Sequence, residues 1–320
     1  MEKDNYAIVV ESLRKSYKGK EVLKNVNLSI LQGSIYALLG SNGAGKTTMI
    51  RILTTQIKAD SGRVAVEGYD TRTNAGKIHE VISLTGQFSA VDEKLTGKEN
   101  LMIMGRLRQL QNPEEKAEEL LNYFELSKST DCAVSSYSGG MKRKLDIAMS
   151  LVGDPKIIFL DEPTTALDPQ SRRGMWKIIR ELNRSGVTIF LTTQYLEEAE
   201  QLADRVGVLD KGKIIAEGTP TELKEYIPRE SVQFTFESEE LLKKAKLLMQ
   251  EYKILSDTRE KKITIFTDNK VDLMEKIFHR FHENNIKVLD FSTVTPSLED
   301  AFLTIIADKE DAHENSIKKI

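Results

Sequence analysis

The residues best suited to chemistry occupy positions 40–47, where GSNGAGKT fits the pattern G-x-x-x-x-G-K-[ST]. The pattern follows an apolar run and precedes a helical segment, which is the strand–loop–helix context that it requires. Its glycines allow backbone N–H groups to surround phosphate oxygens, and the helix N-terminus contributes its positive dipole end. In such a loop Lys46 contacts the β- and γ-phosphates and the hydroxyl of Thr47 binds Mg²⁺. The sequence therefore predicts a nucleotide phosphate site.

Two acids, Asp161 and Glu162, follow the apolar residues 157–160. Ligands of open α/β sheets bind at the carboxyl ends of the strands, so these acids are predicted to face the phosphate site. Asp161 is expected to hold Mg²⁺ through water. Glu162 is expected on the opposite side of the strand, where it can orient or deprotonate a water that attacks the γ-phosphate. Taken alone, the pair could equally be an exposed acidic strand end.

A second anion site is predicted where Ser138, Gly139 and Gly140 begin a helix that runs to about Val152. Serine is a favoured N-cap residue, and glycines at a helix start leave backbone N–H groups uncovered. One chain thus carries two separate phosphate-binding elements but a single lysine-containing loop.

In this order, and with two further elements, these motifs resemble the ATP-binding subunits of ABC transporters over about residues 5–220. The five matching elements are the Walker A loop (40–47), Gln87 (Q-loop), the signature (138–140), the Walker B strand (157–162) and the D-loop (166–168). The resemblance implies an α/β fold of the P-loop ABC type, with a three-layer sheet core, an N-terminal antiparallel β subdomain and a helical insertion. It also implies that two such domains pair head to tail, each completing the ATP site of the other, as a homodimer if the partner is the same chain.

Residue roles follow from the resemblance position by position. Tyr17 would stack on adenine, Gln87 would contact Mg²⁺ and the attacking water, and Asp168 would lie at the dimer seam. The alternatives are a plain strand tyrosine, a surface amide and a helix N-cap, and the last of these is compatible with the seam role. The implied ATP-binding residues are Tyr17, Gly40, Ser41, Asn42, Gly43, Ala44, Gly45, Lys46, Thr47, Thr48, Gln87, Ser138, Gly139, Gly140, Asp161 and Asp168. The implied metal ligands are Thr47, Gln87 and Asp161, and the implied catalytic residues are Glu162, Lys46 and Gln194.

The sequence departs from the family's usual residues at Tyr137, Met141 and Gln194. Tyr137 and Met141 replace the outer residues of the signature, whereas Ser138 and both glycines, which contact the γ-phosphate in the family, remain. Gln194 occupies the position where most members carry a histidine that hydrogen-bonds the γ-phosphate. Glutamine keeps a donor and an acceptor at similar reach but has no proton that titrates near neutral pH. We therefore expect Gln194 to sense the γ-phosphate while Glu162 acts as the base.

The 320 residues carry a formal net charge of −3 and the pI is about 6.0, so no basic excess indicates nucleic acid as a partner. The single cysteine, Cys132, excludes an internal disulfide framework and fits a reducing cytoplasm. The N-terminus is charged and lacks the apolar core of a secretory signal, and no apolar run approaches the ~20 residues of a membrane span. If the protein works at a membrane, a separate permease chain must supply the spans.

These residues need a scaffold, and hydrophobic patterning predicts that it is α/β. Apolar runs typical of strands buried on both faces of a parallel sheet lie at 35–39, 157–160, 187–191 and 206–209. We expect an ATP-binding domain over residues 5–222, with a helical insertion at about 95–150. Residues 229–308 are expected to form an α+β accessory domain, whose βαββαβ order suits a ferredoxin-like fold.

Within the family, residues 190–224 and the segment PSLEDAFL most resemble drug-resistance exporters of the daunorubicin type. The expectation is a Mg-dependent ATPase at the cytoplasmic face of the cell membrane. It would couple ATP binding, dimer closure and hydrolysis to transport of a drug, antibiotic or lipid-like molecule by the permease. Two alternatives stay open: a conformational switch with weak hydrolysis, supported by Gln194, and a soluble ABC ATPase that acts on ribosomes or DNA. The sequence identifies neither the cargo nor the second ATP domain.

Overall fold

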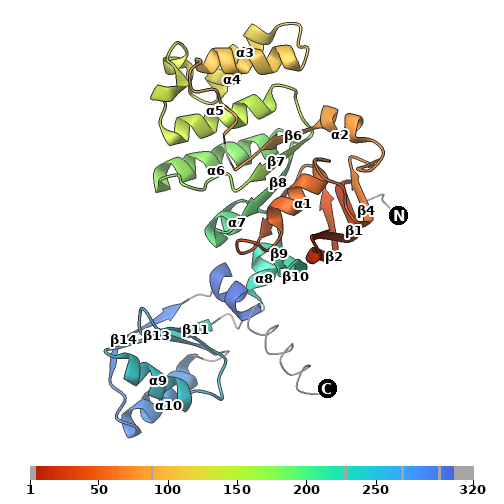
Figure 1. Ribbon diagram of the computed structural model, residues 1–320. Coiled ribbons are helices and arrows are strands. Elements are labelled where there is room, and N and C mark those ends of the chain that lie inside the picture. The colour runs from red at the N-terminus through yellow and green to blue at the C-terminus, as the bar shows by residue number, and fades with distance from the viewer. Residues whose placement is uncertain (1–4, 88, 226–229, 268–269, 295–296, 306–320) are drawn as a thin grey trace. The chain divides into compact units, whose positions relative to one another are not determined.

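The structure is a computed structural model that describes residues 5–87, 89–225, 230–267, 270–294 and 297–305 (Figure 1). The chain divides into two units, Met1–Glu217 and Gly218–Ile320, which are described separately below. The predicted domain limits, 5–222 and 229–308, stay predictions. Of the predicted accessory domain, residues 229, 268–269, 295–296 and 306–308 lie outside the described residues.

The first unit is built on a six-stranded sheet in the order β10-β9-β3-β8-β7-β6. Its strands are β3 (Ile35–Leu39), β6 (Ile82–Thr85), β7 (Ile157–Asp161), β8 (Thr188–Thr193), β9 (Arg205–Asp210) and β10 (Lys213–Gly218). The neighbours β9-β3, β3-β8, β8-β7 and β7-β6 pair in parallel. Every residue of β3 and of β7 is buried. The parallel sheet predicted from the apolar runs is confirmed, and the carboxyl ends of these strands meet at one edge.

A four-stranded antiparallel sheet in the order β2-β1-β4-β5 begins the chain. Its strands are β1 (Tyr6–Tyr17), β2 (Lys20–Leu31), β4 (Ser61–Val66) and β5 (Tyr69–Asp70). A turn at Lys18 and Gly19, with φ angles of 48° and 82°, joins β1 to β2. Two positive φ angles are what a tight hairpin turn needs to match the twist of its strands. The predicted N-terminal antiparallel subdomain is confirmed.

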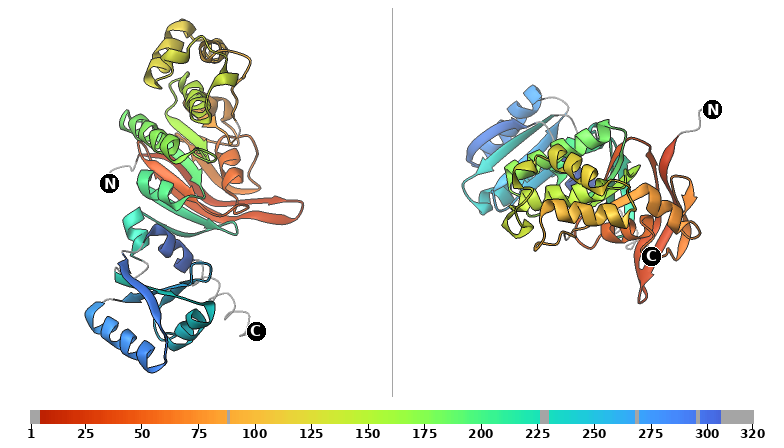
Figure 2. Two further views of the ribbon diagram at one scale, coloured as in Figure 1. Left: turned by 90° about the vertical axis from the view of Figure 1, so that its left-hand side faces the viewer. Right: turned by 90° about the horizontal axis from the view of Figure 1, so that it is seen from above.

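Helices cover both faces of the parallel sheet. The helices on the two faces are α1 (Lys46–Leu53), α2 (Ala75–Val81), α5 (Gly139–Leu151), α6 (Pro169–Arg184) and α7 (Leu196–Leu202). Helix α1 packs against β2, β4 and β7, so it lies between the two sheets. On the opposite face α5 contacts β6, α6 contacts β8, and α7 contacts β3 and β8 (Figures 1 and 2). This arrangement is the predicted three-layer α/β core.

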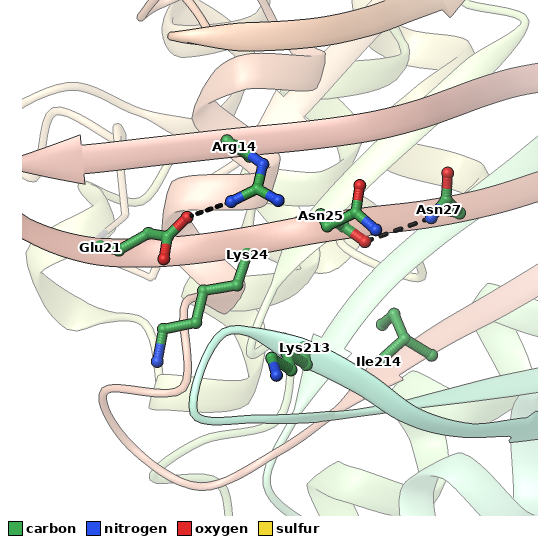
Figure 3. A pocket seen from close by; sticks show the side chains of 7 residues that line it. All are labelled: Arg14, Glu21, Lys24, Asn25, Asn27, Lys213 and Ile214. Carbon is green, nitrogen blue, oxygen red and sulfur yellow. Dashed lines mark hydrogen bonds and ion pairs between the residues drawn. The ribbon is translucent and has the colours of Figure 1, made fainter.

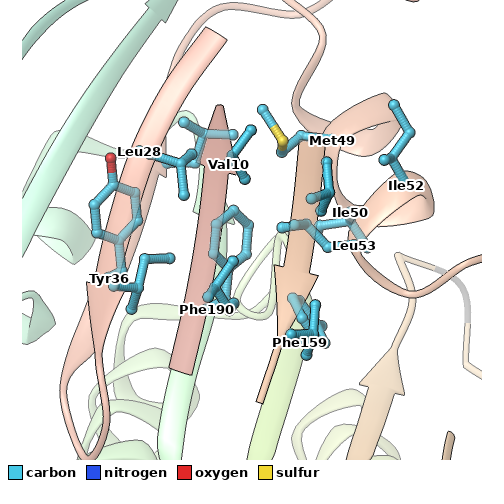
Figure 4. Close-up of a cluster of buried hydrophobic side chains, with 14 of the residues drawn as sticks. Val10, Leu28, Tyr36, Met49, Ile50, Ile52, Leu53, Phe159 and Phe190 are labelled. Atoms are coloured by element: carbon cyan, nitrogen blue, oxygen red, sulfur yellow. The ribbon is translucent and has the colours of Figure 1, made fainter. Parts of the chain in front are cut away.

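Apolar side chains from both sheets and α1 form the main core of the first unit (Figure 4). The ring of Phe190 stacks on that of Tyr36 with centroids 5.8 Å apart. The centroid of the Phe159 ring lies 5.6 Å from the centroid of the Phe190 ring. Met49 and Ile50 of α1 are fully buried in the same cluster. Each such side chain contributes roughly 1.5–3 kcal/mol on burial. The core therefore fixes α1, and with it the loop that precedes α1.

A helical segment separates β6 from β7, and it confirms the predicted insertion. It contains α3 (Gly97–Leu107), α4 (Pro113–Tyr123) and the short helices η1 (Ser127–Ser129) and η2 (Val134–Ser136), and it leads into α5. Helices α3 and α4 pack against each other, above α5 in Figure 1. Thr96 caps α3 in a capping box with Glu99, and Pro113 begins α4.

The second unit contains one sheet in the order β12-β13-β11-β14, with antiparallel neighbours. Its described elements include α8 (Pro220–Lys224), β11 (Glu230–Phe236), α9 (Glu239–Leu248), β12 (Ile254–Asp257), β13 (Lys262–Thr267), α10 (Lys270–Glu283) and β14 (Val288–Val294). From β11 onward this is the split βαββαβ arrangement that the sequence predicts. Phe234, Phe236 and Phe281 are buried in the core that α9 and α10 form with this sheet.

Candidate functional site

The predicted phosphate loop connects β3 to α1 at the carboxyl edge of the parallel sheet. Gly40 approaches β9 so closely that a Cβ atom there would lie 2.4 Å from the carbonyl oxygen of Leu209. Gly45, the N-cap of α1, has a φ angle of 115°, and a Cβ atom would lie 2.8 Å from Cδ2 of Leu23. Any side chain at either position would therefore push the loop away from its support. Residues 41–43 are exposed.

Lys46 begins α1 with 5% of its surface exposed. Its Nζ donates hydrogen bonds to the carbonyl oxygens of Gly40 and Ser41 at 2.8 and 3.3 Å. The same Nζ lies 3.2 Å from Oε1 of Glu162. The predicted phosphate-binding lysine and the predicted base are therefore in contact, and each offsets part of the cost of burying the other's charge.

Asp161 is the last residue of β7 and is buried, and its Oδ1 accepts a hydrogen bond from Oγ1 of Thr192 at 2.6 Å. Glu162 lies beyond the strand and has a φ angle of 50°, in the left-handed region. The prediction that strand alternation directs the Glu162 side chain is therefore wrong. A left-handed turn directs it instead, and the Glu162 N–H donates to the carbonyl oxygen of Thr192 at 3.1 Å. Such a conformation costs a non-glycine residue ~1 kcal/mol or more, and functional sites are where it commonly occurs.

Gln87 follows β6 and is exposed. Its Nε2 lies 3.5 Å from Oε2 of Glu162, at the outer limit for a hydrogen bond. The same oxygen accepts a hydrogen bond from Oγ1 of Thr165 at 3.3 Å. Lys46 thus contacts one carboxylate oxygen of Glu162, while an amide and a hydroxyl contact the other. The orientation of this carboxylate is fixed from both sides.

Gln194 is half-buried in the bend between β8 and α7. The preceding residue, Thr193, accepts a hydrogen bond at its carbonyl oxygen from the N–H of Gly40 at 3.2 Å. The following residue, Tyr195, donates its N–H to Oγ1 of Thr193 at 2.9 Å, and its ring lies 4.9 Å from the guanidinium of Arg172. Gln194 therefore lies between two anchored residues at the rim of the phosphate loop.

Glu198 in α7 is a residue that sequence reasoning missed, because the helix dipole alone explains an acid in a first helical turn. The structure buries it completely. Its Oε1 accepts hydrogen bonds from Oγ1 of Thr164 at 2.8 Å and Nε1 of Trp176 at 3.2 Å. Its Oε2 is buried with no hydrogen-bond partner among the described residues. Burial raises the pKa of Glu198 above its ordinary value of 4.5.

Substituting Glu198 by glutamine is expected to change how stability depends on pH. Because the pKa of Glu198 is raised by folding, the folded protein binds this proton more tightly than the unfolded chain does. The free energy of unfolding of the wild type therefore falls as the pH rises from about 4.5 toward the folded pKa. Glutamine keeps the Oε1 acceptor but does not titrate. Above the folded pKa of Glu198, the free energy of unfolding of the variant should therefore rise relative to wild type by ~1.4 kcal/mol for each unit by which folding raises that pKa. Urea unfolding of both proteins near pH 5 and near pH 8 measures this change. If the free energy of unfolding of the variant differs from that of the wild type by the same amount at both pH values, the prediction is contradicted.

The signature residues lie at an open helix start. Ser138 is the N-cap of α5, as its residue type predicts, and its Oγ accepts a hydrogen bond from the N–H of Met141 at 3.2 Å. Ser138 and Gly139 are exposed, and a Cβ atom on Gly139 would meet no atom within 4 Å. Among the hydrogen bonds and ion pairs of the described residues, none joins Ser138 to Lys46 or Glu162. Gly140 is half-buried, and a Cβ atom on it would lie 2.8 Å from Oγ of Ser171, so the exposed part of this helix start is at Ser138 and Gly139.

Like the signature residues, Tyr17 and Asp168 make no hydrogen bond or ion pair with Lys46 or Glu162 among the described residues. Tyr17 ends β1 with 43% of its surface exposed, and Nζ of Lys15 lies 5.4 Å from its ring centroid. Asp168 is the N-cap of α6, and its Oδ1 accepts hydrogen bonds from the N–H groups of Gln170 and Ser171, both at 3.0 Å. Hydrogen bonds from Ser171 lower the pKa of Asp168. The N-cap role of Asp168 is confirmed, while its seam role and the adenine contact of Tyr17 stay predictions.

A surface pocket of about 670 Å³ lies beside β1, β2 and β10 (Figure 3). Its lining side chains are Arg14, Glu21, Lys24, Asn25, Asn27, Lys213 and Ile214. The guanidinium of Arg14 pairs with the carboxylate of Glu21 at 2.9 Å, which neutralises part of its charge. No predicted site residue lines this pocket.

Known proteins resemble the chain in sequence over most of its length. Residues 23–165 match the family model described as ABC transporter. The chain is 38% identical to the daunorubicin resistance ATP-binding protein DrrA3 of Streptomyces coeruleorubidus, over 96% of this chain and 98% of that protein. It is also 38% identical to the doxorubicin resistance ATP-binding protein DrrA of Mycobacterium tuberculosis, over 98% and 97%. Identity to the linearmycin resistance ATP-binding protein LnrL of Bacillus subtilis is 32%, over 92% and 96%.

Solved structures resemble the fold of the chain as well. The ADP conformation of MJ1267, an ATP-binding cassette of an ABC transporter, matches with a TM-score of 0.62 and 28% identity, covering 68% of this chain and 92% of that one. The dimeric post-hydrolysis state of the ATP-binding cassette MJ0796, bound to ADP and Pi, matches with a TM-score of 0.60 and 25% identity, covering 66% and 98%. Nearly the whole cassette is therefore found within this chain in each case.

Proposed function

The chain belongs to the ATP-binding proteins of ABC transporters, and we propose that it hydrolyses ATP to drive export of a drug, antibiotic or lipid-like molecule. Support for the cargo class comes from the relatives named for daunorubicin, doxorubicin and linearmycin resistance. Support for the chemistry comes from one observation above all. The lysine of the phosphate loop and the amide of Gln87 both contact the carboxylate of Glu162.

ATP would lie along residues 40–48, with Tyr17 against the adenine ring. Lys46 would exchange its contact with Glu162 for the β- and γ-phosphates, which offer it more negative charge. Because the signature helix start is open and makes no contact with Lys46, a second copy of the chain is the proposed partner. In a head-to-tail pair, Ser138, Gly139 and Gly140 of one copy would bind the γ-phosphate held by the other.

Magnesium fits the side chains present. The hydroxyl of Thr47, the buried carboxylate of Asp161 and the amide oxygen of Gln87 are oxygen donors, which Mg²⁺ prefers, together with substrate phosphates and water. Within the described part of the chain, no group of three or more His, Cys, Asp and Glu side chains could hold a metal ion, so phosphates and water would supply the remaining ligands. When bound, the ion would neutralise charge on the phosphates.

Hydrolysis then depends on how this chain's residues arrange one water. Gln87 and Gln194 would position the water and the γ-phosphate through their amides. Glu162 would accept the proton of that water on its carboxylate, which the left-handed turn directs toward the phosphate loop. Lys46 and the signature N–H groups of the second copy would stabilise the charge that develops on the γ-phosphate.

A separate permease at the cytoplasmic face of the cell membrane is the proposed transport partner. Among the described residues, no helix is both long enough and apolar enough to cross a bilayer. Closure of the ATP-bound pair would shift the permease between two states because ATP binds those states with different affinity. A conformational switch with weak hydrolysis is the second candidate, and the glutamine at position 194 is the observation that favours it.

Phosphate release by the purified chain tests the proposal. The wild type is expected to hydrolyse Mg-ATP, and Lys46→Met is expected to lower the rate about a hundredfold or more, because the ammonium group that would stabilise charge on the β- and γ-phosphates is lost. Lys58→Met, which removes an exposed lysine beyond the end of α1, should stay within about twofold of wild type. Absence of turnover in the wild type, alone and with its permease, would contradict the ATPase and favour the switch.

A further inference from the structure

Arg143 connects three segments of the first unit through one buried side chain. It lies on the signature helix α5, one turn after the helix start, and 9% of its surface is exposed. Its Nε donates to the carbonyl oxygen of Pro163 at 2.9 Å, and its Nη1 donates to that of Gly86 at 2.8 Å. Its Nη2 lies 3.4 Å from the carbonyl oxygen of Asp161. The guanidinium therefore contacts the backbone on both sides of Glu162 and the residue immediately before Gln87.

Asp146, on the same helix, completes this arrangement. Its Oδ2 accepts a hydrogen bond from Nη1 of Arg143 at 3.0 Å, and its Oδ1 accepts one from the N–H of Ala90 at 3.2 Å. Asp146 is buried, with 5% of its surface exposed. The pair thus contacts the backbone of Gly86 and of Ala90, which lie on either side of Gln87 in the sequence.

A buried ion pair is a poor device for stability alone, because apolar residues of similar volume often stabilise a fold equally well. What a guanidinium offers is a rigid planar fork that fixes several acceptors at once. Here three of its acceptors are backbone carbonyl oxygens that lie next to Gln87 and Glu162 in the sequence, at Gly86, Asp161 and Pro163. The planar geometry of the guanidinium therefore explains why an arginine occupies position 143.

We propose that Arg143 is a positioning residue that couples the signature helix to Gln87 and Glu162 of the same chain. This rests on the proposed function, in which Gln87 and Glu162 act on the chain's own ATP while the signature completes the site of a second copy. If ATP binding moves the backbone next to Gln87 or Glu162, the hydrogen bonds of the Arg143 guanidinium would transmit that movement to α5. Arg143 would thereby link the two ATP sites of a pair, although it touches neither nucleotide.

The test compares Arg143→Met, Arg143→Lys and Lys144→Met in the full chain. Lys144 is the matched control, since it occupies the same helix and pairs with Glu125 at 3.0 Å but contacts neither loop. Arg143→Met is expected to lower kcat about tenfold or more, with the Kd for ATP within about threefold of wild type and a lower Hill coefficient for turnover. Arg143→Lys should recover part of kcat, because an ammonium still donates to some of these carbonyls. Lys144→Met should stay within about twofold.

Three results would decide against the coupling role while the wild type remains an active ATPase. One is a kcat and Hill coefficient for Arg143→Met that equal those of the wild type. Another is a parallel loss of kcat, ATP affinity and Tm in both Arg143 variants, which would show that the side chain only maintains the fold. The third is an equal loss of kcat in Lys144→Met. Failure of the wild type itself to hydrolyse ATP would instead overturn the proposed function and the coupling role together.

Discussion

With Glu162 replaced by glutamine, the protein is expected to bind ATP but to turn it over about a thousandfold more slowly than the wild type. Glutamine has the same shape and keeps an oxygen that can accept the hydrogen bond from Thr165. Its amide accepts no proton from water, so the step assigned to Glu162 is lost. The substitution also removes the carboxylate that pairs with Lys46 at 3.2 Å. Lys46 is then free for phosphate, and we expect ATP affinity to be equal to that of the wild type or higher.

Two measurements test the Glu162→Gln substitution. Phosphate release gives kcat, and the mass of the protein in solution with and without Mg-ATP shows whether two chains associate. Because ATP is bound and not hydrolysed, the Glu162→Gln variant should accumulate as a pair of chains. Glu197→Gln is the control, since Glu197 is an exposed acid in the first turn of α7 and should leave kcat within about twofold. Turnover by Glu162→Gln above a tenth of the wild-type rate would assign the base to another residue.

The phosphate loop could be predicted in full because its function depends on contiguous residues. Gly40, Gly45 and Lys46 each act within a short stretch, so residue type and spacing determine their geometry. The strands that support the loop were predictable for a similar reason. A strand buried on both faces is apolar throughout, and such runs are visible in the sequence as β3 and β7.

Residues whose importance comes from tertiary burial could not be found in this way. Glu198 and Arg143 look like ordinary charged residues of helices, where a solvated face is the usual position of such side chains. Only the folded chain shows that Glu198 is surrounded by Thr164 and Trp176, and that Arg143 reaches two loops. The left-handed conformation of Glu162 could not be predicted from the sequence, because non-glycine residues seldom adopt this backbone conformation without tertiary support.

Roles that involve a second molecule are a separate case. Tyr17 and the signature are exposed, and their proposed roles need a nucleotide or a second chain, which the packing of a single chain does not contain. The second unit shows the same limit. Its βαββαβ order is predictable from alternating patterns, yet its pattern contains no chemical motif from which a role could be derived.

Gln194→Ala is expected to lower kcat about tenfold to a hundredfold while ATP binding stays within about threefold of wild type. The amide of Gln194 is proposed to contact the γ-phosphate, an interaction that gains strength as charge develops during hydrolysis. Other residues are proposed to hold adenine and the α- and β-phosphates, so ATP affinity should change little. The backbone supports the position, since the hydrogen bond from Gly40 to Thr193 and the Arg172–Tyr195 contact do not involve the Gln194 side chain. Gln56→Ala, at an exposed site beyond α1, is the control.

The pH dependence of turnover distinguishes a glutamine at this position from a histidine. A glutamine has no proton that titrates near neutral pH, so wild-type kcat should show no limb between about pH 6 and 7 that originates at position 194. Gln194→His should introduce such a limb, because imidazole titrates near 6.5 and changes charge next to the phosphate. The difference between the two profiles isolates the residue at 194 from every other ionisable group. If Gln194→Ala hydrolyses ATP at the wild-type rate, and Gln194→His adds no limb, then Gln194 does not contact the γ-phosphate during turnover.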